Sequence, residues 1–157
     1  MRQQLPVFFC LIILVLVLGS CSARKKARSR KVNTIIQTAR SYTGTPYRWG
    51  GTTRAGMDCS GLLVNSFQAG GIKLPRTSHE QAKLGKKVGM KELQKGDLVF
   101  FATGKKRRKI THVGMVTGKK GKDRIMFIHS SSSLGVVETN IYSSYFKKRF
   151  RYGRRVI

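Results

Sequence analysis

The stretch MDCSGLLV, residues 57–64, holds one cysteine, Cys59, between an aspartate and an apolar run. Further along the same segment, Leu63, Val64 and Phe67 recur at the spacing of one helix face, and two consecutive glycines then end the pattern. We therefore predict a helix whose N-terminus lies at or next to Cys59. The residue types alone leave four roles for this cysteine: a small buried hydrophobe, a metal ligand, half of a disulfide, or a nucleophile.

The segments on either side of this helix predict an α+β fold. Upstream, the apolar residues at 32–42 follow helical spacing. Downstream, LPRTSHEQAKL at 74–84 predicts a loop leading into a short helix, with Ser78 and Gln81 at capping-box spacing. From Asp97 onward, short runs rich in Val, Ile, Phe and Thr predict strands: DLVFFAT (97–103), THVGMVTG (111–118), RIMFIHSS (124–131), VVETN (136–140) and RYGRRVI (151–157). Helices followed by a strand meander are typical of an antiparallel sheet packed on helices.

The N-terminus predicts an export signal. Arg2 precedes the apolar run VFFCLIILVLVL at 7–18, which is too short to span a bilayer, since a spanning helix needs ~20 apolar residues. The run ends in LGSC at 18–21, which resembles the lipobox of bacterial lipoproteins, where signal peptidase cleaves before a cysteine that then carries lipid. We therefore predict a signal peptide at 1–20, with the alternative that an ordinary cleavage nearby leaves the cysteine as a plain thiol.

The three cysteines of the chain have different predicted fates. Cys10 is lost with the signal, Cys21 carries lipid and begins a basic tether that ends at residue 31, and Cys59 is the one thiol of the domain at 32–157. A single thiol excludes an internal disulfide and a four-cysteine zinc site. Two roles therefore remain for Cys59, a buried structural residue or a reactive nucleophile.

The chain is strongly basic, with 32 Lys and Arg against 6 Asp and Glu and a net charge of +26. The basic residues form three runs: ARKKARSRK (23–31), GKKRRK (104–109) and KKRFRYGRR (147–155). Such charge attracts polyanions, and behind an export signal these are lipid head groups, lipopolysaccharide and acidic wall polymers. Plain solubility is the alternative. Nucleic acid is not an expected partner, because the export signal opposes it and the sequence holds no recognisable binding motif.

Two of the three histidines fall on neighbouring predicted strands. If the loop at 118–123 closes symmetrically, His112 lies directly opposite His129, and paired side chains of this kind have Cβ atoms only ~4.5–5.5 Å apart. One ring nitrogen of His112 is then held by His129, which leaves the other for Cys59, the general pattern of an activated nucleophile. A chance cross-strand pair or a metal site are the alternatives. The sequence offers no third ligand at fixed spacing, so we expect no metal or cofactor. His79 falls on a polar helix turn, and we expect it at the surface.

Six segments of the chain, in this order, resemble the NlpC family of papain-like bacterial cell-wall cysteine peptidases: GTPYRWGG (44–51), DCSGLLV (58–64), LPRTSHEQ (74–81), KGDLVFF (95–101), HVGMVTG (112–118) and IHSSSSLGVV (128–137). The resemblance implies a papain-like fold, with the cysteine at a helix start packed on a sheet that carries the histidines. It implies Cys59 as the nucleophile, His112 as the general base and His129 as the residue that orients it.

The same resemblance extends to the substrate cleft and the activity. Tyr47 matches the family's active-site tyrosine, and Asp58 and Ser60 match positions that line the cleft. Packing of the loop over the helix is the alternative role for Tyr47 and Trp49. The implied reaction is hydrolysis of peptidoglycan stem peptides through an acyl-enzyme, by a monomer without a cofactor.

The proposed compartment is the cell envelope, with the protein anchored by its N-terminal lipid and the outer membrane favoured because Ser22 replaces a retention aspartate. The competing functions are a non-catalytic lipoprotein that binds anionic envelope polymers, and an amidase or acyltransferase on the same fold.

Overall fold

The computed structural model describes residues 5–106, 108–121 and 123–157, and in the first helix it describes side chains from residue 22 onward. The chain divides into two units, Met1–Lys31 and Val32–Ile157. The described part of the first unit is helical and belongs to helix α1 (Leu5–Ser41). Cys21, the predicted lipidation site, lies outside the described side chains.

Helix α1 begins far earlier than the sequence analysis predicted, because the basic tether segment is also helical. Its alanines, arginines and lysines are good helix formers, and no glycine or proline interrupts residues 22–41. Hydrophobic periodicity missed this part of the helix because the segment has no apolar face. Across the described residues, no helix is both long and apolar enough to span a membrane.

Helix α2 (Cys59–Ala69) begins at the cysteine, which confirms the predicted helix start. Asp58 is its N-cap, and the Asp58 side chain accepts a hydrogen bond from the backbone N–H of Gly61 at 2.7 Å. Two glycines end the helix, and the second, Gly71, has a φ of 72° that favours glycine. The short helix α3 (Ser78–Gln81) is also present, but its N-cap is Thr77 and not the predicted Ser78.

Six strands form one antiparallel sheet in the order β3-β8-β4-β5-β6-β7. They are β3 (Lys86–Val88), β4 (Leu98–Phe101), β5 (His112–Lys119), β6 (Ile125–Ser131), β7 (Gly135–Asn140) and β8 (Phe150–Arg155). The sequence predicts all of these strands except β3. It does not predict the small hairpin of β1 (Thr52–Thr53) and β2 (Gly56–Met57), the 3-10 helix η1 (Met90–Glu92), or helix α4 (Ser144–Arg149).

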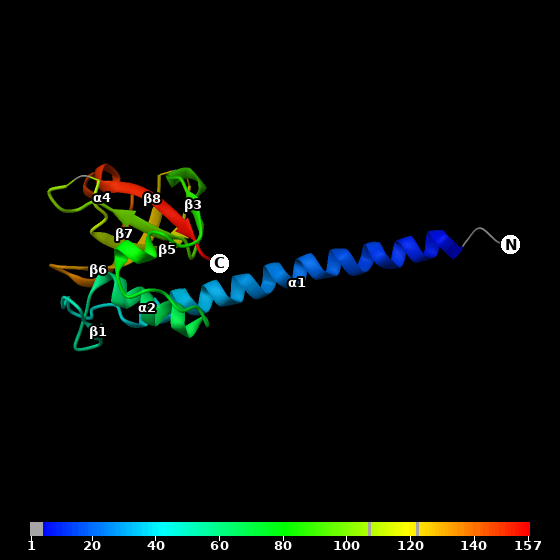
Figure 1. Cartoon of the computed structure of the whole chain (residues 1–157), viewed down its shortest axis with the longest axis horizontal. Helices are drawn as coiled ribbons and strands as arrows, with labels where there is room; N and C mark the ends of the chain where they lie inside the picture. The colour runs from blue at the N-terminus through cyan, green and yellow to red at the C-terminus, as the bar shows by residue number, and fades with distance from the viewer. Residues whose placement is uncertain (1–4, 107, 122) are drawn as a thin grey trace. The chain divides into compact units, whose positions relative to one another are not determined.

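Both faces of the sheet are buried. Along β4, Leu98 and Phe100 belong to an apolar cluster that includes residues of α2, whereas Val99 and Phe101 belong to a second cluster against which Phe146 of α4 packs. Helices α2 and α4 accordingly lie on opposite sides of the sheet (Figure 1). This mixed arrangement of helices and an antiparallel sheet confirms the predicted α+β class.

The hairpin of β5 and β6 corrects one prediction. Met115 pairs with Ile128, and extending this register places His129 opposite Gly114, two residues from the predicted partner His112. The hairpin closes later than predicted, with the backbone N–H of Lys120 donating to the carbonyl of Arg124, and a bulge in β5 takes up one residue. Since the net difference is an even number of residues, both histidines still point to the same face of the sheet as diagonal neighbours.

Candidate active site

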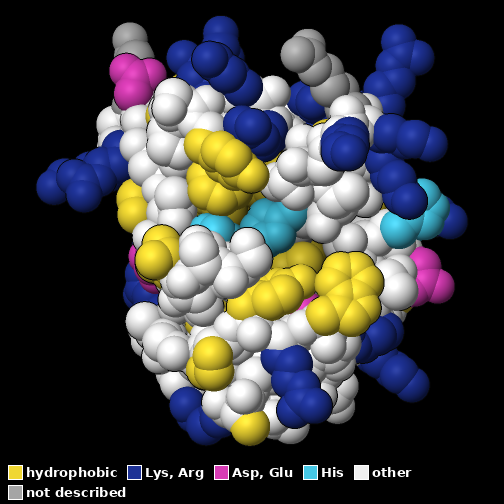
Figure 2. All heavy atoms as spheres, turned by 90° about the vertical axis from the view of Figure 1, so that its left-hand side faces the viewer, with side chains coloured by type: hydrophobic (Ala, Val, Ile, Leu, Met, Phe, Trp, Pro, Cys, Tyr) yellow, Lys and Arg dark blue, Asp and Glu magenta, His cyan; other side chains and the backbone are white. Residues whose placement is uncertain are grey.

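A cleft of about 780 Å³ opens where the N-terminus of α2 meets the sheet. The start of α2 forms one wall and the ends of β5, β6 and β7 with α4 form the other. Seen from outside, buried His129 and half-buried His112 lie in a hollow (Figure 2). The cleft is lined by all six residues predicted to carry the chemistry: Tyr47, Asp58, Cys59, Ser60, His112 and His129.

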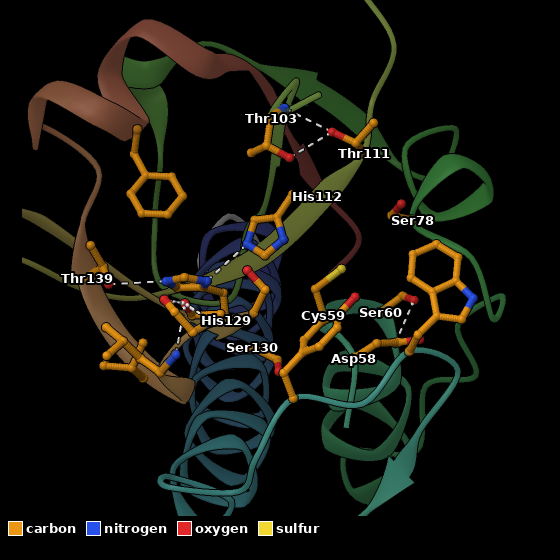
Figure 3. Close-up of a pocket in the computed structure, with 18 of the residues that line it drawn as sticks. Asp58, Cys59, Ser60, Ser78, Thr103, Thr111, His112, His129, Ser130 and Thr139 are labelled. Carbon is orange, nitrogen blue, oxygen red and sulfur yellow. Dashed lines mark hydrogen bonds between the residues drawn. The ribbon is translucent and has the colours of Figure 1, made fainter. Parts of the chain in front are cut away.

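Cys59 is the first residue of α2 and lines the cleft on the helix wall, with 9% of its surface exposed. Burial raises the pKa of its thiol above the usual value, and the charge of Asp58 raises it further. Hydrogen bonds from the backbone of Val113 and Ser60 act in the opposite direction. The thiol is therefore in its neutral form at neutral pH. Figure 3 shows the Cys59 sulfur and the His112 ring on facing sides of the cleft.

Asp58 is held by hydrogen bonds on both carboxylate oxygens. Arg76 donates to them from two guanidinium nitrogens at 2.9 and 2.6 Å, and the backbone N–H groups of Gly50 and Gly61 donate at 2.9 and 2.7 Å. The Ser60 hydroxyl also donates, at 3.1 Å. Burial alone would raise the pKa of Asp58, but the bonds from Arg76 and Gly61 outweigh it and lower that pKa. This carboxylate is thus a charged structural anchor of the helix wall.

His112, His129 and Thr139 form a hydrogen-bonded chain on the sheet wall. The His112 Nε2 and His129 Nδ1 atoms are 3.0 Å apart, and the His129 Nε2 and Thr139 Oγ1 atoms are 3.1 Å apart (Figure 3). Because His112 uses Nε2 for this contact, Nδ1 is the nitrogen left for Cys59. A proton acceptor at Nδ1 requires the proton on Nε2, so His112 donates to His129 and His129 donates to the Thr139 hydroxyl.

Aromatic side chains surround the two histidines. The His129 ring stacks on Phe127 with centroids 4.7 Å apart, and Phe146 of α4 contacts His129 edge-on at 5.1 Å. Burial lowers the pKa of His112 to about 4. Burial, together with the adjacent His112, lowers the pKa of His129 to about 3. Both rings are therefore neutral at neutral pH. Gly114 makes this packing possible, because a Cβ there would lie 2.5 Å from the Phe127 ring.

The loop before α2 supplies the outer part of the cleft. Burial raises the pKa of the Tyr47 hydroxyl, with smaller contributions from Cys59 and Asp58, as expected for a phenol close to both groups. Trp49 is 87% exposed at the rim, so it does not pack over the helix, the alternative considered from the sequence. His79 is exposed and away from the cleft, as predicted.

Three residues of the site were missed from the sequence: Arg76, Thr139 and Phe146. Arg76 lies inside the quoted segment LPRTSHEQ, but its pairing with Asp58 joins residues 18 apart in the chain. Thr139 is two residues from Val137, the strand partner of His129, so it lies on the histidine face once the register is known. No group of three His, Cys, Asp or Glu side chains that could hold a metal ion is found among the described residues.

Comparison with known proteins decides the family. The pattern of the NlpC/P60 family matches residues 44–155. The chain belongs to the NlpC/P60 family. It is therefore a cysteine peptidase with a papain-like fold, which confirms both predictions. It is 38% identical to the probable endopeptidase NlpC of Escherichia coli K12, over 94% of this chain and 99% of that protein.

Other relatives match most of this chain but extend beyond it. The chain is 38% identical over 78% of its length to the murein DD-endopeptidase MepS/murein LD-carboxypeptidase of Escherichia coli K12, of which it spans 62%. The crystal structure of an NlpC/P60 family protein from Bacillus cereus superposes with a TM-score of 0.71 at 32% identity, over 80% of this chain and 40% of that one. The peptidoglycan hydrolase RipB of Mycobacterium tuberculosis superposes with a TM-score of 0.68 at 28% identity, over 85% of this chain and 68% of that one.

Proposed function

We propose that the protein is an exported, lipid-anchored endopeptidase that hydrolyses amide bonds in peptidoglycan stem peptides with Cys59, His112 and His129. The observation that carries this proposal is the position of Cys59 at the start of α2, in one cleft with a His112–His129 pair whose ring nitrogens are 3.0 Å apart. Family membership and the endopeptidase names of the relatives support a cell-wall hydrolase.

The first step is attack of the Cys59 sulfur on an amide carbonyl. Because burial raises the thiol pKa and lowers the His112 pKa, both groups rest neutral, and His112 Nδ1 takes the thiol proton as the carbon–sulfur bond forms. The resulting imidazolium keeps its Nε2 proton directed at His129. The hydrogen bonds that join His112 to His129 and His129 to Thr139 fix the His112 ring in the orientation that this transfer needs.

The developing oxyanion needs donors beside Cys59. The backbone N–H of Cys59 belongs to the first turn of α2, where N–H groups have no acceptor within the helix. The Tyr47 hydroxyl lines the same cleft and supplies a second donor. His112 then gives its proton to the leaving amine, the carbon–nitrogen bond breaks, and an acyl-enzyme remains on sulfur. Water, deprotonated by His112, releases the acid and restores the thiol.

The proposed anchor lies in the N-terminal unit, where Cys21 follows a signal peptide at 1–20 and carries lipid. The basic segment to residue 31 then lies next to an anionic membrane surface. Ser22 favours the outer membrane, with the domain at 32–157 facing the periplasm as a monomer. Fatty-acid labelling that is lost in Cys21→Ala tests the anchor, and persistence of label in that variant contradicts it.

The test of the activity is mass spectrometry of purified peptidoglycan after digestion by the wild type and by Cys59→Ala. We expect fragments cut within stem peptides from the wild type and none from the variant, with circular dichroism showing that the variant is folded. Equal digestion by both proteins ends the proposal. Binding without digestion by either protein favours the non-catalytic lipoprotein, and release of a transferred acyl product favours the acyltransferase.

A further inference from the structure

The fold brings two separate basic runs of the sequence together beside the cleft. The loop between β4 and β5 carries one run and α4 carries the start of the other. They are joined at their base, where Phe101 pairs with Phe150 and the backbone N–H of Ala102 donates to the carbonyl of Arg149 at 3.0 Å. Figure 1 shows this loop next to α4. We define the exposed cations of these two elements as the basic bank: Lys105, Lys106, Arg108, Lys109, Lys147 and Lys148.

The basic bank borders the cleft and has no carboxylate of its own. Thr103 and Thr111, at the two ends of the loop, line the cleft, and so do Tyr145 and Phe146 of α4. The sequence holds no Asp or Glu at 102–111 or at 142–151. In Figure 2, dark-blue side chains gather above the histidines along one side of the hollow. The bank therefore presents a concentrated positive charge to any part of a bound ligand that extends out of the cleft on this side.

The cleft itself offers almost no net charge to a ligand. Among its described lining residues the one Lys or Arg is Arg76 and the one carboxylate is Asp58, and these two are hydrogen-bonded to each other. The two histidines are neutral, because burial lowers their pKa values. A bound molecule thus meets a neutral reacting centre and a strongly cationic border, which matches an uncharged amide with anionic groups further along.

We propose that the basic bank binds the free carboxylates of peptidoglycan strands whose stem peptides occupy the cleft, and so selects acidic over amidated wall polymer. This rests on the proposed function. Stem peptides offer the required chemistry, because a glutamate linked through its γ-carboxyl keeps a free α-carboxylate. Several cations near one another attract such groups over a distance of about one Debye length, ~10 Å at 0.1 M salt.

An anionic membrane is a poorer partner for this surface. The two elements that carry the bank also contribute Thr103, Thr111, Tyr145 and Phe146 to the cleft lining, so a bilayer resting on the bank would lie against the entrance that a polymeric substrate needs. A polymer that is itself held in the cleft can contact the bank without this conflict.

The test measures binding of the full chain in a Cys59→Ala background, so that it does not depend on turnover. One variant replaces the six bank residues by Gln, and a matched variant replaces six exposed lysines outside the cleft lining by Gln: Lys83, Lys86, Lys91, Lys95, Lys119 and Lys120. Each protein is titrated with purified peptidoglycan and with the same material after amidation of its carboxylates. At low salt we expect the bank variant to lose about tenfold in affinity for the acidic polymer, and the matched variant to lose much less.

Amidation of the polymer should remove the difference between the two variants. An equal loss in both variants, or a bank effect that survives amidation, overturns the proposal. So does a bank effect seen on vesicles of anionic phospholipid but not on peptidoglycan. If the six-fold variant fails to fold, Lys147→Gln with Lys148→Gln supplies the same comparison against Lys119→Gln with Lys120→Gln. Failure of the wild type to digest peptidoglycan would end the proposed function while leaving this binding result intact.

Discussion

The helix wall of the cleft carries Asp58 and Arg76 as a charged, hydrogen-bonded pair, whereas the sheet wall carries two histidines that burial keeps neutral. On the helix wall, hydrogen bonds offset the effect of burial on the Asp58 carboxylate and lower its pKa. On the sheet wall, burial acts on the imidazoles with aromatic rings around them and lowers their pKa values. The Asp58 side chain on the helix wall is thus held by charged hydrogen bonds, whereas the two histidines on the sheet wall are held by packing and by hydrogen bonds between neutral groups.

This difference assigns separate tasks to the two walls. Asp58 caps the helix that begins at Cys59, but its charge also raises the pKa of the Cys59 thiol. The His112 imidazole opposite is unprotonated at neutral pH, because its own pKa lies far below 7, so its Nδ1 lone pair is available to a proton. Variants that exchange or remove these properties should therefore affect the two walls differently.

The largest effect is expected from removing the proton acceptor. His112→Gln keeps a group able to donate to His129 but cannot take the Cys59 proton, so peptidoglycan hydrolysis should fall by about 10⁴-fold. His79→Gln is the matched control, because His79 is exposed and lies outside the cleft lining. Release of soluble fragments from purified wall measures both. A comparable loss in the control would show that the effect is not specific to the sheet wall.

The neutral state of the sheet wall should make stability depend on pH. Folded His112 has a pKa of about 4, below the unfolded value of 6.5, so the unfolded chain binds more protons between these values. Stability is then fully present above pH 6.5 and falls as the pH drops toward 4, by about 3 kcal/mol for this residue. His129 acts in the same direction.

Urea denaturation at pH 7 and pH 4 measures this effect. His112→Gln should lose clearly less stability on acidification than the wild type, while His79→Gln should behave like the wild type. Parallel pH dependence in all three proteins would mean that the histidine pair is not held neutral by the fold.

The features that the sequence alone predicts are those that depend on near neighbours. Asp58, Cys59 and the two glycines after the apolar run define α2 within residues 58–71, and its start was predicted correctly. The strands carrying the histidines were also predicted, because their β-branched and aromatic residues recur between glycines and lysines. The missed start of α1 is a local feature too, but its signal is helix propensity and not hydrophobic period.

The register of β5 and β6 depends on distant and small effects. A later turn and one bulge changed the partner of His129 from His112 to Gly114, and nothing in the local composition marks that bulge. The same holds for the Asp58–Arg76 pair and for the contact between His129 and Thr139, which join segments of different elements. The family resemblance named the two histidines that lie together in the cleft, although the register derived from the loop was wrong.

An intermediate effect is expected from neutralising the anchor of the helix wall. Asp58→Asn weakens two charge-assisted bonds from Arg76 and alters the cap of α2, which should lower the free energy of unfolding by about 2 kcal/mol. The thiol pKa should fall at the same time, because the charge of Asp58 raises it and Arg76 is left uncompensated. Cys59 should therefore react faster with iodoacetamide at pH 7, despite the lower stability.

Glu138→Gln is the matched control for this variant. Glu138 pairs with Arg40 at a more exposed position, so its replacement should change stability by at most about 0.5 kcal/mol and leave alkylation unchanged. Adding Arg76→Gln to Asp58→Asn should return the alkylation rate toward that of the wild type. Unchanged or slower alkylation in Asp58→Asn would show that the anchor does not act on the thiol through its charge.

The smallest effect is expected from removing the hydrogen bond between His129 and Thr139 on the sheet wall. Thr139→Val keeps the shape but removes the oxygen that accepts from His129 Nε2, so His129 is free to carry its proton on Nδ1 and can no longer accept from His112. We expect kcat to fall about tenfold with KM unchanged, since Thr139 would orient the base without adding substrate affinity. Thr139→Ser should retain activity because it keeps the acceptor.

Thr103→Val is the control, because Thr103 also lines the cleft but bonds to Thr111 and not to a histidine. A loss expressed in KM, or an equal loss in Thr103→Val, would assign Thr139 to general packing of the wall. A loss confined to kcat and rescued by serine would show that the sheet wall orients His112 through a directed hydrogen bond between neutral groups, whereas Asp58 on the helix wall is held by charge-assisted bonds from Arg76.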